Sequence, residues 1–227
     1  GREHPRTSKA VEQTRGRMPF FGNGLVDAVY SSNCGGHTES GGLVWQGSGH
    51  PYLSGVSDLP DGATPFPDGV GEEAVAAFID HPPPAYCGAT RYGKESYRWT
   101  KTVPVDQVRS GVLEQSGSDP GEVRDLKVLE RGVSGRITRL EVVGASGSVV
   151  LQPELRIRKA LGGLRSSLFV FDRAAENGRP AFRFRGAGFG HGVGMCQIGA
   201  AVMAEQGFSA EEILHRYFRG AALVKRY

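Results

Sequence analysis

Alternating apolar and polar positions predict strands at the start of the chain and throughout its middle. Phe20 and Phe21 are separated by Gly22-Asn-Gly24 from a second apolar run at residues 25–30. An Asn-Gly pair between two apolar runs is a strong signal for a β-hairpin. Further strands are predicted at residues 97–103, 126–131, 136–143, 148–152, 168–171 and 181–184. Short Gly-containing turns between several of them favour antiparallel pairing.

Helical spacing and end signals predict the helices. Ser209 and Glu212 fit a capping box, and the following segment ends at Phe218, shortly before Gly220. Residues 105–113 place Val105, Val108, Val112 and Leu113 on one helical side. The other predicted helices cover residues 10–16, 72–79, 153–161 and 194–205.

These elements predict an α+β protein whose core is formed from both chain ends, with an inserted, mostly antiparallel β lobe. We expect the core at residues 1–58 and 186–227, and the β lobe at residues 95–185. Between them, residues 59–94 are predicted to be an irregular insertion, because prolines at 60, 65, 67 and 82–84 interrupt regular structure.

Composition narrows the possible partners. The chain has 227 residues, of which 39% are hydrophobic and 22% charged, and a formal net charge of +3. It contains no basic run interleaved with aromatic residues, so we expect no nucleic-acid partner. No apolar run approaches the roughly 20 residues of a membrane span, so no such span is predicted. A mild positive charge suits an anionic polymer such as the cell wall.

The most unusual stretch is Gly186-Ala-Gly-Phe-Gly-His-Gly-Val-Gly-Met-Cys-Gln-Ile-Gly-Ala200. Alternating glycines indicate backbone that bends unusually or is approached closely. Neither common phosphate-binding glycine motif is present, so nucleotide binding is not predicted. Two interpretations remain: a tight strand-to-helix junction with a packed histidine, or a groove floor where His191 meets a substrate.

Together with residues 203–209, this stretch resembles the C-terminal signature of the SpoIID/LytB (stage II sporulation protein D, amidase enhancer) family. A second stretch, Asp27-Ala-Val-Tyr-Ser-Ser-Asn-Cys-Gly-Gly-His-Thr-Glu39, resembles the family's Ser-x-x-Gly-Gly-x-Thr-Glu segment. Val44-Trp-Gln-Gly and Pro51-Tyr-Leu continue that match. The resemblance implies a protein that acts on peptidoglycan, either as a lytic transglycosylase or as an enhancer of a cell-wall amidase.

The resemblance also implies that the general acid of a lytic transglycosylase is a glutamate in a Glu-Ala-Leu-Lys-type helix. That helix precedes the segment matching residues 10–16, so the match begins downstream of the acid. We therefore expect a fragment of a longer protein, with little glycan cleavage of its own. The alternative is a non-catalytic peptidoglycan-binding module that enhances an amidase. In either case we expect an exported, extracytoplasmic or cell-wall-associated protein.

The resemblance implies that the two motif segments lie side by side and line a sugar-sized trench. The residues expected to bind glycan there are Ser31, Ser32, Thr38, Glu39, His191 and Gln197. Alternatively, Glu39 fastens the Gly-Gly loop to a backbone N–H, and the hydroxyl groups close turns. His191 would act as a proton carrier or as a hydrogen-bond donor to the glycan.

The three cysteines allow several roles, and their odd number leaves at least one unpaired within the chain. A Cys34–Cys87 disulfide would suit an exported protein. Alternatively, Cys34 and His37 form a Cys-x-x-His pair that could bind zinc, with Cys87 or Cys196 completing the site. A third possibility is a Cys34 nucleophile with His191 as its base.

Overall fold

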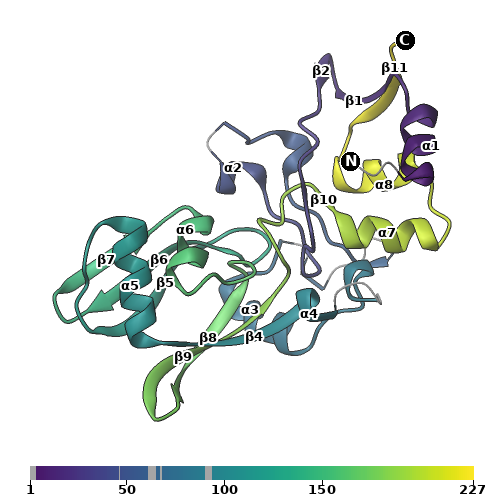
Figure 1. Cartoon of the computed structure of the whole chain (residues 1–227). Helices are drawn as coiled ribbons and strands as arrows, with labels where there is room; N and C mark the ends of the chain where they lie inside the picture. Colours follow the sequence, from purple (N-terminus) through teal and green to yellow (C-terminus); the bar gives the residue numbers. More distant parts are fainter. Residues whose placement is uncertain (1–3, 46, 61–64, 67, 90–93) are drawn as a thin grey trace.

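The two ends of the chain pair with each other. The computed structural model describes residues 4–45, 47–60, 65–66, 68–89 and 94–227. Strand β1 (Arg17–Phe21) lies between β11 (Ala222–Lys225) and β2 (Gly24–Leu25) in an antiparallel sheet. Helices α1 (Pro5–Gln13), α7 (Gln197–Glu205) and α8 (Ala210–Tyr217) lie in the same part of the molecule (Figure 1).

The middle of the chain forms a separate β lobe (Figure 1). One antiparallel sheet has the order β4 (Arg98–Pro104), β9 (Arg179–Ala187), β8 (Phe169–Glu176). The other has the order β5 (Val123–Arg131), β6 (Ile137–Gly144), β7 (Gly147–Leu151). Helices α5 (Val105–Ser116) and α6 (Glu154–Ala160) share a buried apolar cluster with these strands.

A short parallel pairing joins the two motif segments. Strand β3 (Tyr30–Ser31) pairs with β10 (Met195–Cys196). Isolated bridges extend the contact from Asn33 to Phe189 and from Glu39 to Val193. The segments therefore lie side by side, as the resemblance implied. Gln46, in the Val-Trp-Gln-Gly match, lies outside the described residues, as does Pro67 of the predicted insertion.

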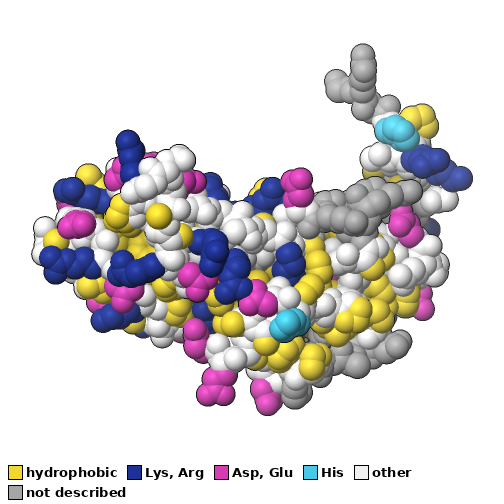
Figure 2. Space-filling model, turned by 90° about the horizontal axis from the view of Figure 1, so that it is seen from below, with side chains coloured by type: hydrophobic (Ala, Val, Ile, Leu, Met, Phe, Trp, Pro, Cys, Tyr) yellow, Lys and Arg dark blue, Asp and Glu magenta, His cyan; other side chains and the backbone are white. Residues whose placement is uncertain are grey.

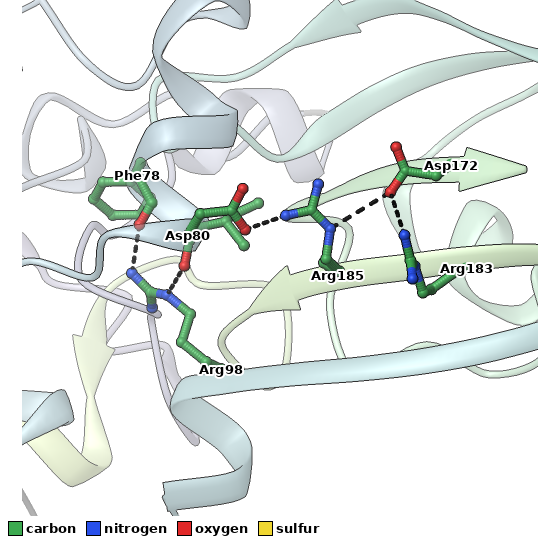
Figure 3. A network of polar contacts seen from close by, with 7 residues as sticks. Phe78, Asp80, Arg98, Asp172, Arg183 and Arg185 are labelled. Atoms are coloured by element: carbon green, nitrogen blue, oxygen red, sulfur yellow. Dashed lines mark hydrogen bonds and ion pairs between the residues drawn. The ribbon is translucent and has the colours of Figure 1, made fainter.

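The predicted insertion contributes ordered elements between the two parts. Helix α3 (Glu72–Asp80) buries Val75 and Phe78 against Leu168, near β8. Figure 3 shows the polar network around the end of α3. Arg98 of β4 donates to the carbonyls of Phe78 and Ile79, which are left without helical partners at this end. The remaining short helices are α2 (Gly41–Val44), η1 (Pro51–Leu53), η3 (Tyr86–Gly88) and α4 (Lys94–Tyr97).

The structure confirms the α+β class and most predicted elements. The hairpin after Phe21 forms, and Ser209 and Glu212 make the predicted capping box. Several predictions were wrong in detail. The helix predicted at residues 10–16 lies at Pro5–Gln13, and of the run at residues 25–30 only Leu25 pairs in the hairpin. Helix α7 begins at Gln197 rather than Gly194, because Met195 and Cys196 pair with β3. Leu113 is exposed, so it does not share the buried side of α5 with Val108 and Val112.

Charge is distributed unevenly between the two parts. Residues 98–187 contain 16 Lys and Arg against 10 Asp and Glu, a net charge of +6 in a chain of net charge +3. Figure 2 shows Lys and Arg side chains over the β lobe, with acidic side chains among them. Among the described helices, none is long and apolar enough to cross a membrane.

Replacing Arg98 tests how strongly this side chain holds α3 in place. We expect Arg98→Gln to lower the free energy of unfolding by about 2–4 kcal/mol, because several partly buried carbonyls lose a charged donor. The control is Arg183→Gln, which removes an exposed ion pair with Asp172 and should cost less than about 1 kcal/mol. Urea unfolding followed by tryptophan fluorescence measures both. Equal losses would contradict the role given to Arg98.

Candidate functional site

The side chain of Arg136 occupies the junction between the motif segments. It enters from the start of β6 and is only 1% exposed. Its Nη2 donates to the carbonyl of Cys34 at 2.9 Å, and its Nη1 donates to the carbonyl of His37 at 3.3 Å. The β lobe thus holds the loop that follows β3 through one buried cation.

The glycines of the long motif make room for this side chain. A Cβ atom at Gly192 would lie 2.3 Å from Cζ of Arg136, and one at Gly188 would lie 2.9 Å from its Nη2. Both residues also have positive φ angles. Elsewhere in the run, a Cβ atom at Gly186 would meet the ring of Trp99 at 2.3 Å. The alternating glycines therefore allow close packing, which favours the interpretation of this stretch as a tight strand-to-helix junction.

Glu39 is buried and directed into the β lobe. Its Oε1 accepts hydrogen bonds from the backbone N–H groups of Ser40 and Val133, at 2.7 and 3.0 Å. Its Oε2 accepts from the hydroxyl of Ser134 at 2.6 Å, and that hydroxyl also accepts from Arg136 at 2.8 Å. Burial raises the pKa of the Glu39 carboxyl above its ordinary value. Glu39 fixes the turn between β5 and β6, not the Gly-Gly loop, and does not face a groove.

The other expected glycan-binding residues divide into buried and accessible ones. Thr38 is buried, and its hydroxyl accepts from the backbone N–H of Val56 at 2.7 Å. Ser31 is buried too, and its hydroxyl has no hydrogen-bond partner among the described residues. Ser32 is half-buried and Gln197 is exposed. Only the last two, together with His191, are placed to meet a ligand from solution.

His191 is a positioned, neutral imidazole. The backbone N–H of Val193 donates to its Nδ1 at 3.0 Å, so the ring carries its proton on Nε2. Burial and the charge of Arg136 lower the pKa of His191 to about 4. At neutral pH the ring is therefore uncharged, and it also bonds to the backbone of Tyr30.

Two exposed aromatic side chains, Tyr30 and Phe189, belong to the paired segments, and a third, Trp45, contacts one of these segments through His191. The ring of Trp45 meets that of His191 edge-on, with centroids 4.6 Å apart. Trp45 is 38% exposed, Tyr30 of β3 is 56% exposed, and Phe189, bridged to Asn33, is 45% exposed. We call Tyr30, Trp45, Phe189 and His191 the aromatic face. Four hollows in the described part of the chain are lined by other residues than these four side chains. The sugar-sized trench stays a prediction.

The three cysteines gather beneath these segments. All are fully buried free thiols, and the sulfurs of Cys34 and Cys87 are 3.7 Å apart, so the structure holds no disulfide between them. The carboxylate of Asp58 completes a group whose four ligand atoms, including Sγ of Cys196, all lie within 4.8 Å of one another. Such a donor set could hold a metal ion.

Two cysteine hypotheses are corrected by this arrangement. His37 lies outside the group of four, because the short turn directs its Nδ1 to the carbonyl of Thr38 at 2.8 Å. Asp58 takes the fourth position in its place. Cys34 cannot act as a nucleophile on an external substrate in this conformation, because it is fully buried and burial raises the pKa of its thiol well above the ordinary value.

Sequence reasoning missed Arg136, Ser134 and Asp58. A pattern in the sequence could have indicated that Arg136 is buried. Every second residue after it, at 138, 140 and 142, is buried on the same face of the strand. No local pattern marks Asp58, since its partners lie in distant parts of the chain.

Comparison with known proteins places this arrangement in a family. Residues 39–194 match the family described as a domain of unknown function (DUF8618). The chain belongs to this family. The match begins at Glu39 and ends at Gly194, so it contains the whole Glu39–Ser134–Arg136 network and most of the glycine motif.

The DUF8618 chain is also a distant homologue of SpoIID and amidase-enhancer proteins, which confirms the resemblance found in the motifs. It is 26% identical to the amidase enhancer of Bacillus subtilis (strain 168), over 96% of this chain and 32% of the relative. It is 30% identical to stage II sporulation protein D of Bacillus amyloliquefaciens, over 94% of this chain and 49% of the relative. The chain thus spans between a third and a half of the length of these relatives.

Adding a methyl group at Gly192 tests the packing around Arg136. We expect Gly192→Ala to lower the free energy of unfolding by about 2–4 kcal/mol, since the new atom overlaps a guanidinium that cannot move. Gly178→Ala is the matched control: its φ is also positive, +77°, but a Cβ there meets nothing within 4 Å. The control should cost only about 1 kcal/mol, the backbone penalty alone. Similar losses in urea unfolding would contradict the packing argument.

His191 should make the stability of the domain depend on pH. Its pKa is lower in the folded protein, at about 4, than the ordinary 6.5, so the unfolded chain binds a proton first as pH falls. Stability should therefore decrease between about pH 6.5 and pH 4, by about 1–2 kcal/mol for a partly solvated ring. His191→Gln should remove this part of the pH dependence of the free energy of unfolding, measured by urea titrations at several pH values. If the free energy of unfolding of His191→Gln depended on pH as in the wild type, the neutral, half-buried state assigned to this ring would be contradicted.

Proposed function

We propose that this DUF8618 domain binds the glycan strands of peptidoglycan through its aromatic face. The observation that carries the proposal is the exposure of Tyr30 and Phe189 on the two paired motif segments, with exposed Trp45 against His191. Aromatic rings present flat apolar surface, on which the C–H faces of sugar rings pack. Exposed aromatic residues clustered on such a surface are characteristic of binding sites.

Polar groups beside the rings suit sugar hydroxyls. Ser32 and Gln197 supply accessible donors and acceptors, and the uncharged ring of His191 lies against Trp45. In this proposal the core at residues 1–58 and 186–227 carries the aromatic face, and the lobe at residues 95–185 supports it. The lobe's positive charge complements an anionic cell wall.

The described carboxylates support binding better than cleavage. Glycoside cleavage needs a carboxyl group near the leaving oxygen. Glu39 and Asp58, the carboxylates nearest the buried junction, are hydrogen-bonded within the protein. Asp27, which precedes β3, is exposed. We therefore propose that cleavage of the lytic transglycosylase type, if the protein performs it, uses an acid other than Glu39 or Asp58.

A second function, enhancement of a cell-wall amidase, is favoured by the name of one relative. The Bacillus subtilis protein that matches 96% of this chain is called an amidase enhancer. A domain that binds glycan strands without cutting them would recruit or orient such an amidase on its substrate. Both functions place the protein outside the cytoplasm, at the cell wall.

Sedimentation with purified sacculi tests the proposed binding. We expect the wild-type domain to co-sediment, and the double variant Trp45→Ala/Phe189→Ala to bind about tenfold more weakly, a loss of about 1.4 kcal/mol. The controls are Tyr227→Ala, which removes an exposed aromatic ring near the C-terminus, and Leu155→Ala, which removes an exposed apolar side chain of the β lobe. Both should bind like wild type. A double variant that binds like the controls would refute the proposed surface.

Product analysis and an amidase assay separate the two functions. We expect no soluble anhydro-muropeptides from sacculi incubated with the domain alone. Their release would show that the acid lies within these 227 residues. Stimulation of an added amidase by wild-type protein, lost in the double variant, would support the enhancer function.

A further inference from the structure

Four segments that are distant in sequence converge on one buried point. Cys34 follows β3, Asp58 follows η1, Cys87 lies in η3, and Cys196 ends β10 and caps α7. All four side chains are fully buried. Neither the comparison with known proteins nor the proposed glycan binding gives them a role. We propose that Cys34, Asp58, Cys87 and Cys196 bind a structural zinc ion.

The spacing of the donor atoms fits a tetrahedral ion. With a Zn–S bond of about 2.3 Å, two sulfurs on a tetrahedral zinc ion lie about 3.8 Å apart. The sulfurs of Cys34 and Cys87 are 3.7 Å apart, and all four donor atoms lie within 4.8 Å of one another. A disulfide would instead need an S–S distance of about 2.0 Å. The structure thus presents four donor atoms around one point, rather than one disulfide and a third, unpaired cysteine.

Hydrogen bonds orient the ligands as an outer shell would. Sγ of Cys196 accepts from the backbone N–H groups of Cys34 at 3.2 Å and Gly199 at 3.5 Å. Asp58 accepts from the hydroxyl of Tyr217 at 2.6 Å through Oδ1, and from the N–H of Cys87 at 2.9 Å through Oδ2. Donors of this kind hold anionic ligands in position and tune their affinity for the ion.

One buried cation, Arg136, and one half-buried cation, Arg98, lie next to the cluster. Arg136 donates to the carbonyl of Cys34, and Arg98 donates to the carbonyl of the neighbouring Gly35 at 2.9 Å. Thiolates and a carboxylate buried together are strongly unfavourable without compensating charge. A divalent ion, together with these two guanidinium groups, supplies that charge.

The donor set favours zinc and a structural role. Thiolates select zinc over calcium or magnesium, which prefer oxygen ligands. Four protein ligands fill a tetrahedral site and leave no position for water or substrate. The ion would tie η3 and the start of α7 to the loop after β3, directly beneath the segments that carry the aromatic face.

Elemental analysis tests the site directly. Protein produced in zinc-containing medium, without a metal-affinity tag, should contain about one zinc per chain. Cys87→Ser and Asp58→Asn should each lose most of it. Glu154→Gln is the matched control, because it neutralises another buried carboxylate, in α6, and should retain the ion.

Measurements on the unmodified chain avoid the question of whether the variants fold. Cobalt(II) exchanged for zinc should give the intense visible bands of a tetrahedral, thiolate-ligated ion. Removal of the metal by a chelator should lower the melting temperature of the wild-type protein. Wild-type protein without metal and without cobalt bands would overturn the proposal. A non-reduced mass two hydrogens lower, showing a disulfide among these cysteines, would overturn it too. Because none of these readouts involves peptidoglycan, failure here is distinguishable from failure of the proposed glycan binding.

Discussion

The burial of one guanidinium group, that of Arg136, sets the arrangement of this domain. A cation removed from water is tolerated only where acceptors surround it, and here the carbonyls of Cys34 and His37 and the hydroxyl of Ser134 do so. Glu39 supplies the opposite charge through Ser134. Since Arg136 and Ser134 belong to the β lobe and their partners to the N-terminal motif, this network fixes the two parts of the molecule relative to each other.

This constraint separates supporting residues from residues that can meet a ligand. Glu39 and Thr38 stand out in the motif, yet both are buried and bonded to the protein itself. The accessible chemistry lies on their neighbours: Tyr30, Trp45 and Phe189 point into solvent. The buried residues of the motif thus support the structure, and the exposed side chains beside them form the accessible surface.

Local signals in the sequence were sufficient for most of the fold. The Asn-Gly turn and the Ser209–Glu212 capping box act over a few residues, so they could be recognised without knowledge of the rest. The candidate site was only partly predictable. That both motifs meet followed from the resemblance, but the buried state of Glu39 depends on a turn 95 residues away, at Ser134. Similarly, the Cys34–His37 spacing indicated a ligand pair, whereas the folded loop directs His37 to Thr38 and brings in Asp58.

The pairing of β1 with β11 has a mechanical consequence for the domain. Arg17 pairs with Lys225 and Phe20 with Ala222, so the polypeptide enters and leaves this ribbon at the same end. Tension applied to both strands at that end would break the hydrogen-bonded residue pairs one after another, instead of loading all of them at the same time. Strands loaded in this way separate at low force, so β1 and β11 would come apart before the load reached the buried Arg136 network.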